Sequence, residues 1–305
     1  MTEPKLNYLR CPDASGGHRM AYWQWGNPDS GHVVLCVHGL SRQGRDFDVL
    51  AQALCQGTGL ERGGIRVICP DIVGRGESDW LTDPMGYQLP FYAADMLALL
   101  AQLHAQAPIT TLDWVGTSMG GLIGIIVCGQ PDLLPAVPMR KLVLNDVGPS
   151  IQWSAVVRIG TYLGQSGQFN SVQDAADAMW AVSTSFGPHT PEQWLALSRH
   201  MVKSVPGIDG KLRLHYDPAI AVPFRQATEE STRQGEATLW QLYDQITAQA
   251  LLVRGQNSDL LSPETAEAMT LRGPRPKRLE FAGVGHAPTL VANDQVAAVA
   301  GFLLA

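Results

Sequence analysis

Two kinds of hydrophobic pattern alternate along the chain. Short runs of β-branched and other apolar residues recur, separated by longer segments with apolar residues at helical spacing. The strongest runs are residues 33–37, 66–69, 111–115, 142–144 and 250–253, with an earlier candidate at 19–25 and a weaker last one at 278–281. Continuous apolar runs are typical of strands covered on both faces, so the alternation predicts an α/β fold with a mostly parallel sheet.

Three segments carry the pattern of packed helices. In residues 91–103 the apolar positions recur at helical spacing, and residues 119–128 form a small, apolar segment that suits a buried helix. Residues 294–304 have the pattern of a closing amphipathic helix. Helices between and after the strands complete the α/β pattern.

The alternation of strand-like and helix-like segments stops between residues 148 and 234. This region contains helix-favouring segments at 174–182 and 191–202 but no convincing core strand. We therefore predict that residues 148–234 form an inserted helical cap, or lid, and that residues 1–147 and 235–305 form the core. In open α/β folds the ligand crevice lies at the carboxyl ends of the strands, so the cap is expected to cover that edge.

The composition narrows the classes of partner. The 305 residues are 45% hydrophobic and 16% charged, with a formal net charge of -6, which gives no electrostatic reason to expect nucleic acid or an anionic membrane surface. No apolar run is long enough to span a bilayer, and the first residues lack the apolar stretch of a signal peptide. We expect a cytoplasmic protein with no nucleic-acid or membrane partner; the oligomeric state is left open.

The five cysteines indicate neither disulfides nor a zinc site of the usual spacing. Cys36, Cys69 and Cys128 lie in apolar segments and are predicted to be buried, reduced thiols. No Cys-x-x-Cys pair occurs, so neither a redox dithiol nor a zinc site is expected. We expect no metal and no organic cofactor.

The most specific motif follows the strand predicted at residues 111–115. Gly116-Thr117-Ser118-Met119-Gly120-Gly121 stands between that strand and a predicted helix, as a nucleophile elbow requires. The turn is tight and its central residue is strained, so small residues must flank it. The motif predicts that Ser118 presents its hydroxyl to the crevice, at a helix N-terminus.

A serine nucleophile needs a base and an acid. His286 is the best-placed base, because it follows the last predicted strand and precedes the C-terminal helix. Asp259 is the favoured acid, since it follows a late strand and precedes His286, while Asp146, directly after residues 142–144, is the competitor. The predicted catalytic residues are therefore Ser118, Asp259 and His286.

Further candidates surround this set. The backbone N–H groups of Leu40 and Met119 are the expected oxyanion donors, and His38 is expected to brace the first of these loops. Arg42 or Arg45 could meet a polar group of the substrate, or could form structural pairs with neighbouring aspartates. Aromatic residues of the predicted cap could line an apolar pocket or simply pack: Trp153, Tyr162, Trp180 and Phe186. Residues 70–78 lack the pattern of a nucleotide fingerprint and indicate a structural turn.

These motifs resemble the α/β-hydrolase superfamily, and the resemblance covers nearly the whole chain. The segments that carry it appear in family order: His38-Gly39, residues 70–78, the elbow at Ser118, Ser258-Asp259 and Gly285-His286. The resemblance implies an eight-stranded, mostly parallel sheet with helices on both faces and a helical cap after the sixth strand. The chain is most similar to small bacterial carboxylesterases, enol-lactonases and meta-cleavage-product hydrolases. A serine at the elbow disfavours the relatives that use aspartate as nucleophile.

The resulting expectation is a serine hydrolase of the carboxylesterase type. It would cleave a carboxylic ester of a small organic molecule through an acyl-enzyme on Ser118. Two alternatives stay open: a carbon–carbon bond hydrolase of the meta-cleavage-product type, which uses the same residues, and a ligand-sensing homologue with little turnover.

Overall fold

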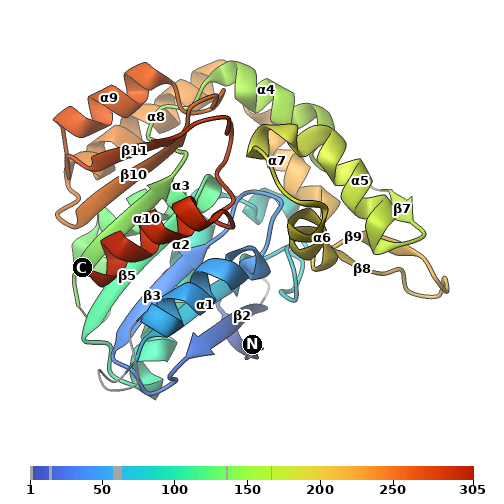
Figure 1. Ribbon diagram of the computed structural model, residues 1–305, viewed down its shortest axis with the longest axis horizontal. Helices are drawn as coiled ribbons and strands as arrows, with labels where there is room; N and C mark the ends of the chain where they lie inside the picture. The colour runs from blue at the N-terminus through green and yellow to red at the C-terminus, as the bar shows by residue number, and fades with distance from the viewer. Residues whose placement is uncertain (1–2, 14–15, 58–63, 135–136, 166) are drawn as a thin grey trace.

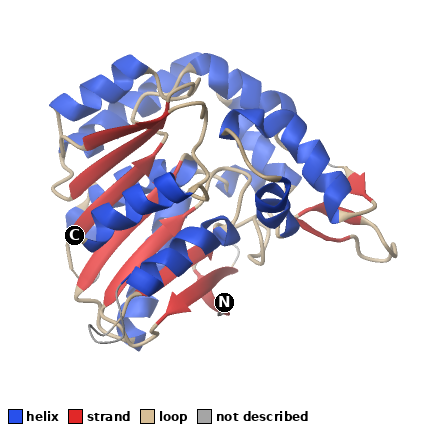
Figure 2. Ribbon diagram, in the orientation of Figure 1, coloured by secondary structure: helices blue, strands red, loops and turns tan. Residues whose placement is uncertain are grey.

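An eight-stranded sheet lies at the centre of the computed structural model, which describes residues 3–13, 16–57, 64–134, 137–165 and 167–305 (Figures 1 and 2). In spatial order its strands are β1 (Lys5–Cys11), β2 (His18–Gly26), β4 (Arg66–Asp71), β3 (His32–Val37), β5 (Thr111–Thr117), β6 (Met139–Asn145), β10 (Gln249–Gly255) and β11 (Lys277–Phe281). β2 runs antiparallel to β1 and β4, and the other neighbouring pairs are parallel. The predicted mostly parallel eight-stranded sheet is confirmed.

The edge strand β1 was absent from the predicted strands. Leu9 and Cys11 are its two buried residues, and the other positions are exposed or half-buried. An edge strand with one face toward solvent shows no continuous apolar run, so the hydrophobic pattern gave little sign of it.

Helices cover both faces of this sheet. The described helices of the chain are α1 (Asp48–Gly57), α2 (Leu89–Gln106), α3 (Met119–Cys128), α4 (Trp153–Tyr162), α5 (Val172–Ser183), α6 (Pro191–Arg199), α7 (Ala221–Gln226), α8 (Glu229–Asp244), α9 (Pro263–Leu271) and α10 (Asn293–Leu304). Buried residues of α1 and α10 share one hydrophobic core, whereas those of α2, α3, α8 and α9 belong to the other. Within the described residues, no helix combines the length and the apolar character needed to cross a membrane.

The central strand β3 shows why the hydrophobic runs are continuous. Val33 and Leu35 contribute to the core beneath α2 and α3, while Val34 and Cys36 contribute to the core beneath α1 and α10. All four are fully buried. Because side chains alternate between the faces of a strand, a strand covered on both sides needs apolar residues at every position.

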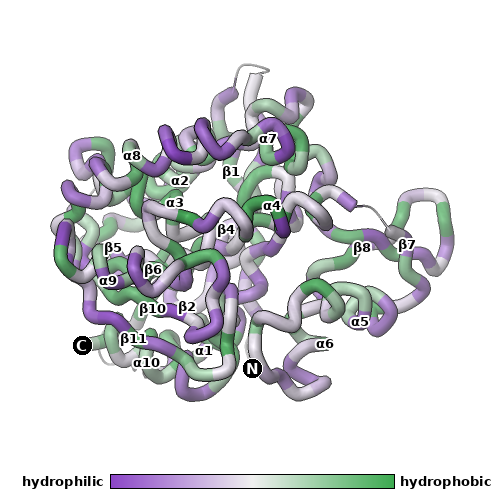
Figure 3. The backbone as a smooth tube through the Cα atoms, turned by 90° about the horizontal axis from the view of Figure 1, so that it is seen from above, coloured by the Kyte–Doolittle hydropathy of each residue, from purple (hydrophilic) through white to green (hydrophobic). Residues whose placement is uncertain are grey.

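The segment between β6 and β10 contains α4 to α8 and a second, smaller sheet. That sheet consists of β7 (Gln168–Phe169), β9 (Leu212–Leu214) and β8 (Val202–Ser204), and the hydrophobic pattern did not predict it. Figures 1 and 3 show α5, α6 and these strands to one side of the large sheet. Helices α5 and α6 share a small hydrophobic core, which includes Trp194 and Leu197 and is completed by Val291 from the connection before α10.

The predicted end of the cap at residue 234 falls inside α8. This helix packs against α3, and its residue Tyr243 is fully buried in the main core. The helix runs through position 234 in spite of Gly235, so the sequence offers no sign of the point at which the chain returns to the core.

The burial of β3 between the two cores leads to a prediction about stability. Replacing the fully buried Leu35 with alanine should lower the free energy of unfolding by about 2–5 kcal/mol, because the cavity adds to the lost apolar burial. Leu271→Ala is the matched control, since Leu271 is 69% exposed and its loss should change stability by less than about 0.5 kcal/mol. Urea denaturation followed by circular dichroism measures both; equal effects would contradict the assignment of β3 to the core.

Candidate active site

The turn from β5 to α3 holds Ser118 in a strained conformation. Its backbone has φ 52° and ψ −117°, a combination rarely adopted by residues other than glycine. A Cβ on Gly116 would lie 2.3 Å from the carbonyl oxygen of Gly120, and one on Gly120 would lie 2.0 Å from that of Val37. Only glycine fits at these two positions, so the predicted spacing of glycines around Ser118 reflects close packing of α3 on the sheet.

The loop between β11 and α10 brings His286 to this serine. Ser118 Oγ and His286 Nε2 lie 2.8 Å apart, within hydrogen-bond distance. Ser185, from the segment between β6 and β10, holds this loop: its carbonyl accepts from the Gly285 N–H at 2.6 Å, and its hydroxyl donates to the His286 carbonyl at 3.0 Å. The structure therefore brings together two residues that are far apart in the sequence, as predicted.

The carboxylate that meets the other ring nitrogen of His286 belongs to Asp146. Its Oδ2 lies 2.7 Å from His286 Nδ1 and accepts a hydrogen bond from Ser258 Oγ at 2.7 Å, while its Oδ1 accepts from the Gly255 N–H at 2.8 Å. Asp146 is fully buried directly after β6. These contacts assign the proton to Nδ1, which leaves Nε2 free to accept from Ser118.

The structure contradicts the predicted contact between Asp259 and His286. Asp259 instead pairs with Arg158 of α4, with Oδ2–Nε and Oδ1–Nη2 distances of 2.6 and 2.9 Å, and its side chain is 45% exposed. It lies four residues beyond the end of β10 at Gly255, and the loop turns Ser258, rather than Asp259, toward Asp146. The useful signal was proximity to a strand end, because a residue directly after a strand has little freedom in where it points.

His38 braces the loop after β3. The Ile72 N–H donates to its Nε2 at 2.9 Å, so Nδ1 carries the proton and donates to the Gly39 carbonyl at 2.7 Å. Burial lowers the pKa of His38 to about 3, so this ring stays neutral at ordinary pH. Gly39 passes close to the serine: a Cβ on Gly39 would lie 3.7 Å from Ser118 Cβ.

Arg75 is a site residue that the sequence pattern did not reveal. Its buried guanidinium donates to the Leu40 carbonyl at 2.8 Å and to the Val73 carbonyl at 2.7 Å, and it contacts the Met119 sulfur at 3.8 Å. The turn in residues 70–78 is structural, as predicted, but its arginine reaches both residues expected to supply oxyanion donors. An arginine between two glycines gives no sign in the sequence of where its long side chain ends.

A cavity of about 320 Å³ opens above Ser118. Ser118, His286 and Leu40 lie at its base, and α4, α5 and their connections form much of its wall. Its apolar lining includes Phe47, Ile159, Tyr162, Phe169, Met179, Phe186, Leu197, Met201 and Leu214. Such a volume suits a small organic ligand.

The predicted substrate-contacting residues divide into two groups. Arg42 lines the cavity, but its guanidinium is paired with Asp46, with both nitrogen–oxygen distances at 2.7 Å. Arg45, Trp153 and Trp180 are not among the described residues that line the cavity. Arg45 pairs with Asp48, and Trp180 packs edge-on against Trp194 in the small core. Of the four aromatic candidates, Tyr162 and Phe186 reach the cavity.

This arrangement has the parts of a nucleophilic site. A hydroxyl lies within hydrogen-bond reach of an imidazole, and a buried carboxylate orients that imidazole. Met119 begins α3, and an N–H in the first turn of a helix has no carbonyl partner within that helix. Such an N–H, together with that of Leu40, can donate hydrogen bonds to a substrate oxygen on which negative charge develops.

The chain is similar to known hydrolases. A sequence model described as the alpha/beta hydrolase family matches residues 34–299. A 3-hydroxybutyrate-oligomer hydrolase of Cupriavidus necator is 48% identical over 295 residues, which are 96% of either chain. An alpha/beta hydrolase from Novosphingobium aromaticivorans is 34% identical with a TM-score of 0.81, covering 100% of this chain and 99% of its own. A putative hydrolase from Rickettsia typhi is 26% identical with a TM-score of 0.83, and the match covers 98% of this chain and 99% of the Rickettsia chain.

A matched pair of variants can distinguish the roles of Asp146 and Asp259. Asp146→Asn should slow modification of Ser118 by a fluorophosphonate and hydrolysis of p-nitrophenyl acetate by about 10³- to 10⁴-fold, because the imidazole loses its orienting carboxylate. Asp259→Asn should retain both rates within about tenfold, as its carboxylate contacts Arg158 instead. The reverse ranking would restore Asp259 as the acid.

Proposed function

The chain belongs to the α/β-hydrolase family, and from this premise we propose that it is a serine esterase acting on short hydroxy-acid esters, with oligomers of 3-hydroxybutyrate as its leading substrate class. The observation that carries the proposal is the hydrogen-bonded series Ser118–His286–Asp146 at the base of the cavity. The substrate class comes from the name of the 48% identical relative.

In the proposed acylation step, Ser118 Oγ attacks the ester carbonyl carbon. Its proton passes to His286 Nε2, and Asp146 stabilises the imidazolium that forms. The carbonyl oxygen becomes an oxyanion between the N–H groups of Leu40 and Met119. When the tetrahedral intermediate collapses, His286 returns the proton to the leaving alkoxide, so an alcohol departs and an acyl-enzyme remains.

Deacylation repeats these steps with water. His286 removes a proton from a water molecule, the resulting hydroxide attacks the acyl carbonyl, and the same two N–H groups hold the oxyanion. Ser118 then leaves with the proton from His286, which releases a carboxylic acid. For a hydroxy-acid oligomer, the leaving alcohol is the hydroxyl end of one part, and the released acid is the carboxyl end of the other.

The lining of the cavity supports this class of substrate. Such an oligomer alternates small alkyl branches with ester groups, which need apolar contacts and hydrogen-bond donors close together. Apolar side chains such as Ile159 and Met179 supply the first kind of contact. Ser41 and Gln165 also line the cavity and offer hydroxyl and amide donors for ester oxygens.

A substrate panel tests the proposal. The wild-type protein should hydrolyse the dimer and trimer of 3-hydroxybutyrate and short-chain p-nitrophenyl esters, with acid release followed by pH-stat titration. Ser118→Ala should lower kcat by about 10⁵- to 10⁶-fold, whereas Ser204→Ala, on the exposed end of β8, should leave it unchanged within about twofold. Turnover of a vinylogous diketone without turnover of any ester would instead identify a carbon–carbon bond hydrolase.

The contact between Arg75 and the loop after β3, which carries Leu40, leads to a second prediction. Arg75→Met should lower kcat by about 10²-fold with a much smaller change in KM, because a loosened Leu40 loop weakens a contact formed mainly in the transition state. Arg75→Lys keeps the charge but loses most of the donors, so an intermediate kcat is expected. Steady-state kinetics with one p-nitrophenyl ester measures both, and a change confined to KM would contradict this role.

A further inference from the structure

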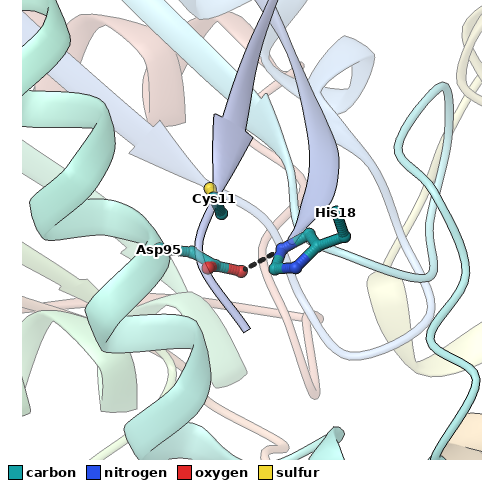
Figure 4. Close-up of side chains that lie close together, drawn as sticks. All are labelled: Cys11, His18 and Asp95. Atoms are coloured by element: carbon teal, nitrogen blue, oxygen red, sulfur yellow. Dashed lines mark hydrogen bonds and ion pairs between the residues drawn. The ribbon is translucent and has the colours of Figure 1, made fainter. Parts of the chain in front are cut away.

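Away from the cavity, a cysteine, a histidine and an aspartate meet in the core. Cys11 ends β1, His18 begins β2 and Asp95 lies on α2 (Figure 4). Their exposed fractions are 0%, 5% and 2%, and one potential ligand atom from each lies within 4.8 Å of the others. Among the residues that the structure describes, no other group of three such side chains comes together in this way.

We propose that Cys11, His18 and Asp95 form a binding site for a divalent transition-metal ion, with zinc as the favoured ion. A thiolate, an imidazole nitrogen and a carboxylate are the ligands that zinc takes in proteins, whereas calcium and magnesium require oxygen ligands. The second carboxylate oxygen of Asp95 offers a fourth donor atom to such an ion. This site is separate from the proposed esterase chemistry and does not depend on it.

The surroundings of His18 are those of a metal-ligating histidine. Asp13 Oδ2 lies 3.0 Å from His18 Nδ1, and the Gly17 N–H donates to the other Asp13 oxygen at 2.7 Å. This arrangement holds the ring so that Nε2 faces Asp95 Oδ2, also at 3.0 Å. Metal-ligating histidines commonly donate their other ring N–H to a carboxylate, which fixes the tautomer and the orientation of the ring.

Charge gives a second reason for a cation at this place. Two buried carboxylates, those of Asp13 and Asp95, face a single imidazole. A dication between Nε2 and the Asp95 carboxylate would take the place of the hydrogen that now joins them, and the Cys11 thiol would lose its proton as its metal–sulfur bond forms. The ion would thus bring positive charge to two carboxylates whose side chains are buried.

The position of the cluster assigns the ion a structural role. Its three ligands join the outer pair of strands, β1 and β2, to the helix that packs against them, and Phe91 of α2 stacks on the His18 ring at 5.4 Å. The absence of a Cys-x-x-Cys pair led us to expect no zinc site. That expectation considers only ligands close in sequence, whereas His18 and Asp95 are 77 residues apart.

Cobalt provides the direct test. The full-length protein, freed of metal by dialysis against EDTA, is titrated with CoCl₂. We expect one equivalent to bind and to produce an intense thiolate-to-cobalt charge-transfer band in the near ultraviolet. One equivalent of ZnCl₂ should abolish the band by competition and raise the melting temperature. Failure of the wild-type protein to give the band, or to respond to zinc, would overturn the proposal.

Matched variants locate the site. Cys11→Ala should abolish the charge-transfer band, and Cys128→Ala, which removes a buried thiol from α3 outside the cluster, should leave it intact. Asp13→Asn should weaken metal affinity by about 10- to 100-fold, because the Asp13 carboxylate orients the ring of the proposed ligand His18. Should Cys11→Ala not fold, Asp13→Asn and the wild-type titration still decide. A band that persists in folded Cys11→Ala would overturn the assignment.

Discussion

The close approach of α3 to the sheet is the constraint on which the site depends. The helix lies so near to β5 and β3 that a Cβ on Gly116 or Gly120 would strike a backbone carbonyl. Ser118 sits in the turn that this approach forces, with a positive φ that serine rarely adopts. The hydroxyl is thereby fixed at the carboxyl edge of the sheet. The next residue, Met119, is the first residue of helix α3. Local strain at one residue is maintained by the packing of two cores.

Parallel strands bring the remaining groups to that edge. Leu40 follows β3, Asp146 follows β6 and His286 follows the edge strand β11, each on the connection beyond the end of its strand. Hydrogen bonds then hold these connections in place. The Asp146 carboxylate accepts from the Gly255 N–H at the end of β10 and from the Ser258 hydroxyl beyond it, while Ser185 holds the His286 loop. Segments from distant parts of the chain therefore orient a single imidazole.

Buried polar groups hold the loop after β3 that carries Leu40. His38 is kept neutral by burial and links the chain at Ile72 to Gly39. Arg75 reaches the Leu40 carbonyl from the turn after β4. His38 and Arg75 both have hydrogen-bond partners, as polar groups removed from water require, and these contacts give the loop a defined shape beside Ser118.

The sequence alone determined the features that depend on neighbours along the chain. Continuous apolar runs identified the buried strands, and glycines at fixed spacing identified the turn at Ser118, because alternation and steric room are local properties. The place of His286 followed from its position after the last strand. The edge strand β1 and the small sheet of β7, β8 and β9 escaped detection, since short or half-exposed strands have no distinctive pattern.

Tertiary structure decided which distant side chains meet. Asp146 and Asp259 both follow strands and both precede His286, so chain order could not distinguish them; the direction of a loop after β10 did. The reach of Arg75 and the meeting of Cys11, His18 and Asp95 are of the same kind. A side chain's partner in a folded core depends on how strands and helices pack in three dimensions, and no spacing along the chain records that.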